Sequence, residues 1–250
     1  MKKIFILTAL TLLTLTTVQA QPRQGSGPHL GAALTKLFGE NQTFTAQMEF
    51  QMPDPSSGQV ITMPGKMIFD SGKSRFEMNL AEVKGSKMPP EAAAQMKAMG
   101  MDTMVSISRP DRKVAYIVYP GMQGYVETPL TDKNDSASAD DFKSEITELG
   151  KDVVDGHDCV KNKVVVTAKD GTKQESTVWN AKDLKNFPVK IETTDQGRKT
   201  AMFFKDVTLA KPDAGNFETP SGFTKYASLQ EMMQAVMMKQ MGGMMRPPGQ

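Results

Sequence analysis

The sequence predicts an α+β fold that is mainly β, with an antiparallel sheet and a few short helices. Three observations predict it. Apolar residues recur at every second position over several stretches, which is the period of half-buried strands. Turn residues separate these stretches at the spacing of a meander. Helical patterns are short and lie before, between and after the strands. About eight to ten strands at this spacing are typical of a sandwich or barrel.

The first twenty residues predict the compartment. Lys2 and Lys3 precede an apolar run over 4–15, and residues 18–20 (Val-Gln-Ala) form a small-x-small cleavage site. This is the pattern of a secretory signal peptide, which is too short for a stable membrane span. We expect cleavage after Ala20 and a periplasmic location, with full secretion as the second expectation. No later run is long and apolar enough to predict a transmembrane anchor.

Charge and cysteine content limit which partners the protein is expected to bind and how its fold is expected to be stabilised. The chain carries 30 Lys and Arg against 28 Asp and Glu, and the signal peptide holds two of the Lys. The mature chain is therefore neutral, which gives no reason to expect a nucleic acid partner. Cys159 is the single cysteine, so no internal disulfide is expected and an apolar core must stabilise the fold.

The elements follow in order along the chain. Residues 21–39 predict a loose N-terminus and a helix near 29–38, which ends at Gly39. Alternation then places one apolar face on each of three strands: Phe44, Ala46, Met48, Phe50 and Met52; Ile61, Met63, Met67 and Phe69; Phe76, Met78 and Leu80. Pro89, Pro90 and Gly100 frame a short helix in a Met-rich insertion over 88–104.

The second half is predicted to return to strands. The stretch 113–119 is apolar on both alternating faces, so it should be covered on both. A strand near 125–130 and a polar loop over 131–141 come next, and 142–149 predicts a short helix. Further strands are expected over these ranges: 160–167, 174–179, 187–194 and 200–209.

The C-terminal segment is rich in Met. Ser228 and Glu231 form a capping box, an apolar stripe follows, and Gly242 and Gly243 should end the helix, which gives a predicted helix over 228–241. This segment and the insertion hold 12 of the 20 Met residues. Three hypotheses stay open for the terminal helix: docking on its own domain, covering an apolar groove, or binding Cu(I) through thioethers.

Motifs for catalysis are not found. The chain has two His residues and no nucleophile elbow, metalloprotease His pair or phosphate-binding Gly loop. We therefore expect no enzyme, no catalytic residues, no cofactor and no metal ligands. His157, Asp158 and Cys159 form one compact group, which we interpret as a hairpin turn led by Gly156 beside a small, partly buried Cys. A transition-metal site and an intermolecular disulfide are the alternatives.

Three stretches carry a resemblance to a known family: residues 65–80 (GKMIFDSGKSRFEMNL), 106–130 (SISRPDRKVAYIVYPGMQGYVETPL) and 217–223 (FETPSGF). They resemble the periplasmic lipoprotein-carrier superfamily with the LolA-like fold. The resemblance runs from about Phe44 to Phe223. The second half looks closer to an uncharacterised branch than to the carrier proper.

The resemblance implies an unclosed antiparallel half-barrel covered by short helices, with an apolar interior that takes acyl chains. It places the half-barrel over 40–226, with a lid insertion at 88–104, and leaves 227–250 as a Met-rich amphipathic helix and tail. The family's cavity Arg corresponds to Arg75, but alternation sets Arg75 opposite Phe76. Either Arg75 points into the cavity and Phe76 faces a covering helix, or Arg75 does not line the cavity.

The function expected is non-enzymatic binding of a lipid, lipoprotein acyl chain or other apolar ligand by a periplasmic carrier or sensor. The alternatives are Met-rich copper binding and a module that docks an envelope protein partner through its C-terminal helix. The ligand-binding residues expected are Phe44, Met48, Phe50, Met63, Met67, Phe69, Arg75, Met96, Met99, Tyr116, Val118, Met232, Met233 and Met237.

Overall fold

A computed structural model describes residues 32–54, 57–86, 88–130, 142–195 and 197–244. The predicted signal peptide, most of the N-terminal segment before the first helix, and the polar loop over 131–141 lie outside the described residues. Their assignments therefore stay predictions.

Twelve strands of the described chain form one sheet in the order β12-β6-β5-β4-β3-β2-β1-β11-β10-β9-β8-β7. The strands are β1 (Thr43–Pro53), β2 (Val60–Asp70), β3 (Lys73–Asn79), β4 (Thr103–Arg109), β5 (Val114–Tyr119), β6 (Gly124–Pro129), β7 (Lys143–Val154), β8 (His157–Thr167), β9 (Lys173–Ala181), β10 (Phe187–Asp195), β11 (Arg198–Thr208) and β12 (Thr224–Tyr226). The two outermost strands, β12 and β7, do not pair with each other. The sheet is therefore open, which confirms the predicted half-barrel.

The sheet is antiparallel apart from one pair. Strand β12 runs parallel to β6, with Thr224 opposite Gly124 and Tyr226 opposite Val126. The predicted antiparallel sheet is therefore confirmed, with the short edge strand β12 as its one parallel member among the described strands. Three residues are too few to show a period, so the sequence pattern did not reveal β12.

The predicted helix over 142–149 was also wrong, because this segment begins β7. Strand β7 pairs with β8 along its whole length, with a bulge between Glu148 and Gly150. It is the edge strand of the sheet, and nearly all of its side chains are exposed. An edge strand without a buried face shows no alternation, so its pairing with β8 decides its conformation.

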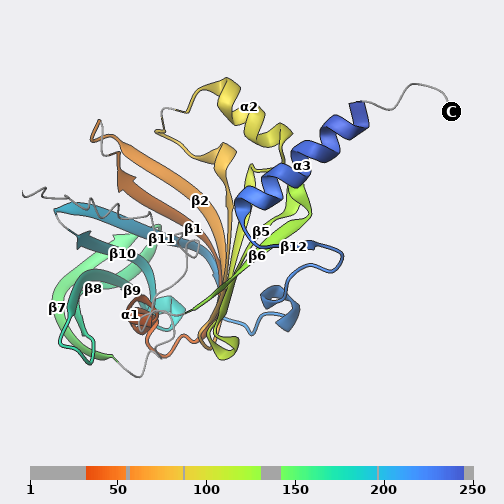
Figure 1. The fold of residues 1–250 in the computed structure, drawn as a ribbon. Helices are drawn as coiled ribbons and strands as arrows, with labels where there is room; N and C mark the ends of the chain where they lie inside the picture. The colour runs from red at the N-terminus through yellow and green to blue at the C-terminus, as the bar shows by residue number, and fades with distance from the viewer. Residues whose placement is uncertain (1–31, 55–56, 87, 131–141, 196, 245–250) are drawn as a thin grey trace, which may run out of the picture.

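The helices are short and lie at the ends or edge of the sheet (Figure 1). They are α1 (Ala32–Thr35), α2 (Pro90–Ala98) and α3 (Leu229–Met244), with 3-10 turns η1 (Lys36–Phe38), η2 (Leu80–Glu82), η3 (Pro110–Arg112), η4 (Pro120–Met122), η6 (Lys182–Leu184) and η7 (Ala214–Phe217). Helix α3 continues through Gly242 and Gly243, so the predicted stop there was wrong. No helix in the described part of the chain is long and apolar enough to cross a membrane.

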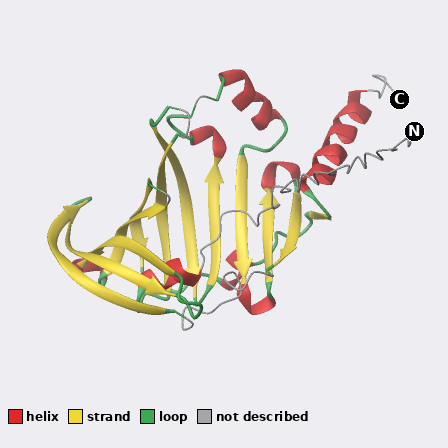
Figure 2. Cartoon of the chain, turned by 60° about the vertical axis from the view of Figure 1, so that its left-hand side comes forward, coloured by secondary structure: helices red, strands yellow, loops and turns green. Residues whose placement is uncertain are grey.

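The sheet curves around an aromatic cluster, and Phe38 of η1 lies at its centre. The Phe38 ring centroid lies between 4.8 and 5.9 Å from four other Phe ring centroids: Phe44, Phe69, Phe187 and Phe204. These rings come from β1, β2, β10 and β11, and neighbouring strands are about 4.8 Å apart. A flat sheet could not bring β2 and β10 to one side chain. We call the face that meets Phe38 the inner face; Figure 2 shows the curvature.

The opposite, outer face has its own apolar cluster over β2 to β5. Ile68, Val105, Ile107, Tyr116 and Val118 pack there around Phe217, which is fully buried. Phe217 belongs to η7, in the segment that leads from β11 to β12. The chain therefore covers this part of its outer face with its own residues.

Helix α3 docks through its first turns. Met232 is fully buried and packs with Tyr119, Met122 and Tyr226. Gly124 permits this contact, because a Cβ atom there would lie 2.9 Å from the Met232 sulfur. The Ser228 half of the predicted capping box forms, because its hydroxyl accepts from the Glu231 N–H; the Glu231 carboxylate accepts from the N–H of Ala227, one residue before the N-cap, instead of from Ser228.

Candidate functional site: an apolar belt on the inner face

The inner face carries Met and Phe side chains from five adjacent strands. Directly opposed residues of paired strands project to the same face, so the register defines the set. We call it the Met/Phe belt: Met48 and Phe50 of β1, Met63 and Met67 of β2, Phe76 and Met78 of β3, Met104 of β4 and Met202 of β11. It runs across the sheet from β11 to β4.

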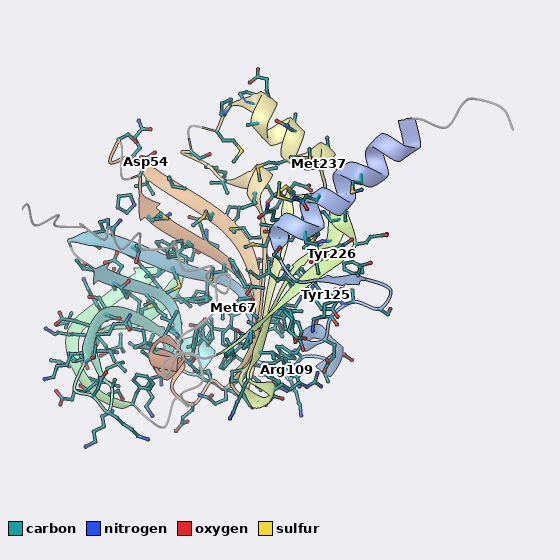
Figure 3. The ribbon with its side chains drawn as sticks, viewed as in Figure 1. Asp54, Met67, Arg109, Tyr125, Tyr226 and Met237 are labelled. Atoms are coloured by element: carbon teal, nitrogen blue, oxygen red, sulfur yellow. The ribbon has the colours of Figure 1, made fainter. Side chains whose placement is uncertain are left out.

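The belt is apolar but not sealed. Met48, Met67 and Met78 are buried. The other five members remain half-buried: Phe50, Met63, Phe76, Met104 and Met202. Figure 3 labels Met67 on the inner side and Arg109 on the outer side of the sheet. A row of half-exposed apolar side chains on a curved sheet is a surface that an apolar ligand could complete.

Predicted ligand residues divide among several places. Met48, Phe50, Met63 and Met67 lie in the belt. Phe44 and Phe69 are on the same face but are fully buried against Phe38, so they form the core beneath it. The prediction thus located four belt residues.

Three predicted residues lie on the outer face, and their grouping with the belt was wrong. Arg75 is opposite Ile68 and Ile107 in the register, and its guanidinium donates to the Glu77 carboxylate at 2.7 Å and the Asn216 carbonyl at 3.2 Å. Tyr116 and Val118 belong to the outer cluster around Phe217. Strand β5 is apolar on both faces, so its sequence did not show which face was inner.

The Met residues of the helices do not cover the belt uniformly. Helix α2 has no buried residue; Met96 within it and Met99 at its C-cap are half-buried. In α3, Met232 is buried and Met233 half-buried, whereas Met237 is 55% exposed. Of the three hypotheses for the terminal helix, docking on its own domain is the one that the first turns of α3 follow. The exposed Met237 lies beyond these turns.

Ion pairs reinforce the covered outer face. Arg109 donates two hydrogen bonds to Asp111, at 2.9 and 2.8 Å, and one at 2.6 Å to Glu218, which also pairs with Arg112. Arg109 lowers the pKa of the Asp111 carboxyl, and Arg112 followed by Arg109 lowers that of Glu218. These contacts hold the segment around Phe217 against β4.

The compact group at 157–159 adopts the interpretation preferred from sequence. The Cys159 side chain is buried and its Sγ donates to the His157 carbonyl, while the His157 ring bonds Asp183 at 2.7 Å. Burial raises the pKa of the Cys159 thiol. Among the described residues, no three His, Cys, Asp or Glu side chains converge as a metal site.

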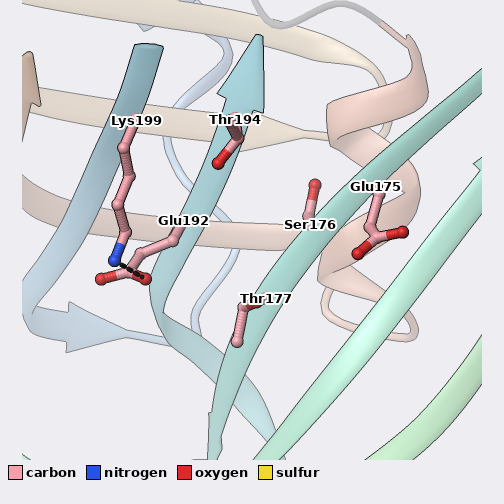
Figure 4. A pocket seen from close by; sticks show the side chains of 6 residues that line it. All are labelled: Glu175, Ser176, Thr177, Glu192, Thr194 and Lys199. Atoms are coloured by element: carbon pink, nitrogen blue, oxygen red, sulfur yellow. Dashed lines mark ion pairs between the residues drawn. The ribbon is translucent and has the colours of Figure 1, made fainter. Parts of the chain in front are cut away.

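A polar hollow lies on the outer face of β9 to β11 (Figure 4). Its lining residues are Glu175, Ser176, Thr177, Glu192, Thr194 and Lys199. Glu192 forms ion pairs with Lys190 and Lys199, each at 2.8 Å. These charges satisfy each other, so the hollow suits water rather than an apolar ligand.

Sequence reasoning missed other parts of the inner face. Met78, Met104 and Met202 complete the belt, and Met101 and Met122 lie beside α3. Met78 lies two residues after Phe76, and Met202 lies two residues before Phe204. The period of a strand therefore indicated that each Met shares a face with its Phe. Nothing in the local sequence marks Met104 or Met122, because their places depend on the pairing of β3 with β4 and on the docking of α3.

Comparison with protein families identifies the domain. The family model described as a domain of unknown function, DUF4412, matches residues 44–187, which is more than half of the chain. The chain belongs to the DUF4412 family. No curated protein matches it at a significant level.

Solved structures similar to this DUF4412 chain include members of the superfamily that the sequence resembles. A LolA superfamily protein from Nitrosomonas europaea has 12% identity and a TM-score of 0.35, with 76% of this chain and 98% of that chain covered. LprF from Mycobacterium bovis has 11% identity and a TM-score of 0.39, with 73% and 94% covered. MucB, solved in complex with MucA, has 14% identity and a TM-score of 0.37, with 76% and 59% covered.

Proposed function

We propose that this protein is a non-enzymatic, apolar-ligand-binding protein of the periplasm, a carrier or sensor for a lipid or a lipoprotein acyl chain. The observation that supports this most is the Met/Phe belt, an apolar surface left half-exposed on the inner side of an open, curved sheet. Burying about ten methylenes on such a surface would contribute roughly 8 kcal/mol before the costs of association. That is enough for reversible binding.

The composition of the belt favours a ligand of variable shape. Six of its eight members are Met, whose unbranched thioether side chain adapts to irregular apolar surfaces. A rigid aromatic or β-branched lining would select one shape. A Met lining therefore suits acyl chains that differ in length and unsaturation.

The direct test is native mass spectrometry of mature protein taken gently from its own cell envelope. We expect a heterogeneous adduct with the mass of acyl lipids. Binding of a naphthylamine fluorescent probe to delipidated protein then gives the affinity. A clean protein mass together with no probe binding would contradict the proposal.

A matched pair of variants on β2 locates the binding surface. Met63→Gln places an amide in the belt, and Lys66→Gln places the same side chain on the outer face of the same strand. We expect Met63→Gln to weaken probe binding about tenfold, since a buried amide without a partner costs about 1–3 kcal/mol. Lys66→Gln should change it less than twofold. Equal effects would show that the probe binds elsewhere.

Copper binding is the second candidate, because the fold brings Met residues from distant segments together. Met122 and Met232 belong to one buried cluster, and Met101, Met104 and Met233 pack against it. Thioether donors suit Cu(I). Titration with Cu(I) tests this function in the wild type and in a variant that combines Met104→Leu, Met122→Leu and Met233→Leu. Weaker Cu(I) binding by the variant would support a copper site. Equal affinity would mean that these Met residues only pack against one another.

An envelope protein partner would use the outer part of α3. Met237 and Met238 are 55% and 70% exposed, whereas Met232 anchors the helix. Met237→Gln with Met238→Gln therefore tests docking without undocking α3. Loss of a co-purified protein with probe affinity unchanged would favour the interaction module.

A further inference from the structure

A row of hydroxyl groups borders the belt on the inner face. Ser176 of β9 is opposite Thr193 of β10, and Thr193 is opposite Thr200 of β11. Opposed residues share a face. The Thr193 and Thr200 hydroxyls bond each other at 2.7 Å. We call these three residues the hydroxyl row.

The adjacent row on the same face is apolar and continues into the belt. Val178 is opposite Ile191, Ile191 is opposite Met202, Met202 is opposite Phe50, and Phe50 is opposite Met63. Val178, Ile191 and Met202 each lie two residues from a member of the hydroxyl row. Val178 and Ile191 are buried, so this row joins the core to the belt at Met202, and the hydroxyl row lies beside it on β9, β10 and β11.

Ser176 differs from the two Thr residues in its hydrogen bonding. It is 3% exposed, and its hydroxyl has no hydrogen-bond partner among the residues that the structure describes. Figure 4 shows its side chain pointing the opposite way to that of Thr177, the next residue of the same strand. A buried hydroxyl without a partner is unfavourable, and alanine would fill the same position without that cost. The hydroxyl is therefore explained best by a partner that arrives from outside the chain.

We propose that the Ser176 hydroxyl donates a hydrogen bond to the acyl carbonyl oxygen of the bound ligand. This rests on the proposed function and adds the ligand class: a chain that ends in an ester, amide or acid carbonyl. The hydrocarbon lies on the Met/Phe belt, and the hydroxyl row marks where the hydrocarbon stops. One hydroxyl of the Thr193–Thr200 pair donates to the other, whereas the buried Ser176 hydroxyl has no partner among the described residues, which makes Ser176 the donor of this proposal.

The test compares two ligands that differ in one group. Methyl palmitate and hexadecyl methyl ether have the same chain, but the ether has a methylene in place of the carbonyl. Each competes with the naphthylamine probe on full-length mature protein. We expect the wild type to bind the ester five- to tenfold more tightly than the ether, a ratio in the range of one hydrogen bond.

Ser176→Ala should abolish that preference by weakening the ester five- to tenfold while leaving the ether unchanged. Its denaturant midpoint should not fall, because the hydroxyl it loses bonds none of the described residues. Thr177→Val on the outer face of the same strand is the matched control and should keep the preference.

The possible failures are distinct. If the wild type binds both ligands equally, or if Ser176→Ala keeps the preference, the assignment of Ser176 is overturned while the proposed function stands. If Ser176→Ala lowers the denaturant midpoint without changing the preference, the hydroxyl serves the fold alone, and the assignment is again overturned. If neither ligand displaces the probe and the probe itself does not bind, the proposed function falls first.

Discussion

The two faces of the sheet are both apolar around β3 and β4, but the chain covers the outer face more completely than the inner face. On the outer face, Phe217 fills the cluster, and Arg109 ties its segment to β4 through Asp111 and Glu218. On the inner face, Phe76 and Met104 stay half-buried, and no ion pair of the described residues closes over them. A face sealed by its own chain is structural, whereas a face left half-open is available to a ligand. This contrast can be tested from either side.

The largest expected effect comes from opening the sealed face. Phe217→Ala should destabilise the fold by about 3–5 kcal/mol, because it removes a fully buried aromatic side chain. Phe50→Ala, on the open face, should cost about 1–2 kcal/mol because Phe50 is half-exposed. Denaturant unfolding measures both. Probe affinity should show the reverse order, and a larger binding loss in Phe217→Ala would contradict the assignment of the faces.

The docking of α3 gives the next largest effect. Met232→Ala should cost about 2–4 kcal/mol, because the buried side chain anchors the helix beside Gly124. Hydrogen exchange should show faster exchange confined to α3, β12 and β6. Met237→Ala is the control on the same helix and should change neither quantity, since that side chain is exposed. Unchanged exchange of α3 in Met232→Ala would show that another contact holds the helix.

A smaller effect concerns the ion pairs of the sealed face. The pKa of Glu218 lies below its ordinary value of 4.5 in the folded protein. A carboxyl with a lowered pKa stabilises the fold above its unfolded pKa, and this contribution is lost as pH falls through the folded value. Glu218→Gln should therefore be less stable than wild type at pH 7 by under about 1 kcal/mol, since the pair is partly exposed. The two curves should converge below about pH 4; parallel curves would rule out this linkage.

The strands were predictable where one face is buried and the other is not. Alternation in 43–52 and 61–69 gave β1 and β2 together with four belt residues. It failed for β7, which has no buried face, and for β12, which is too short. It also could not tell inner from outer in β5, because Tyr116 and Ile117 are both apolar and only the distant packing of Phe217 decides between them. The hydroxyl row was not predictable, since it exists only through the register of three strands.

The smallest expected effect tests the strand that the sequence pattern missed. Ile146 is 67% exposed in β7, opposite Val164 of β8. Ile146→Thr keeps β-branching and removes little buried surface, so stability should change by less than about 0.5 kcal/mol. Val164 is buried on the neighbouring strand, between Ile146 and Ser176 in the register, and Val164→Ala should cost clearly more, because it removes a buried apolar side chain. Denaturant midpoints compare the two. A large loss of stability in Ile146→Thr would mean that another surface covers the β7 edge in solution. Strand β7 would then be covered, as the outer face is by Phe217.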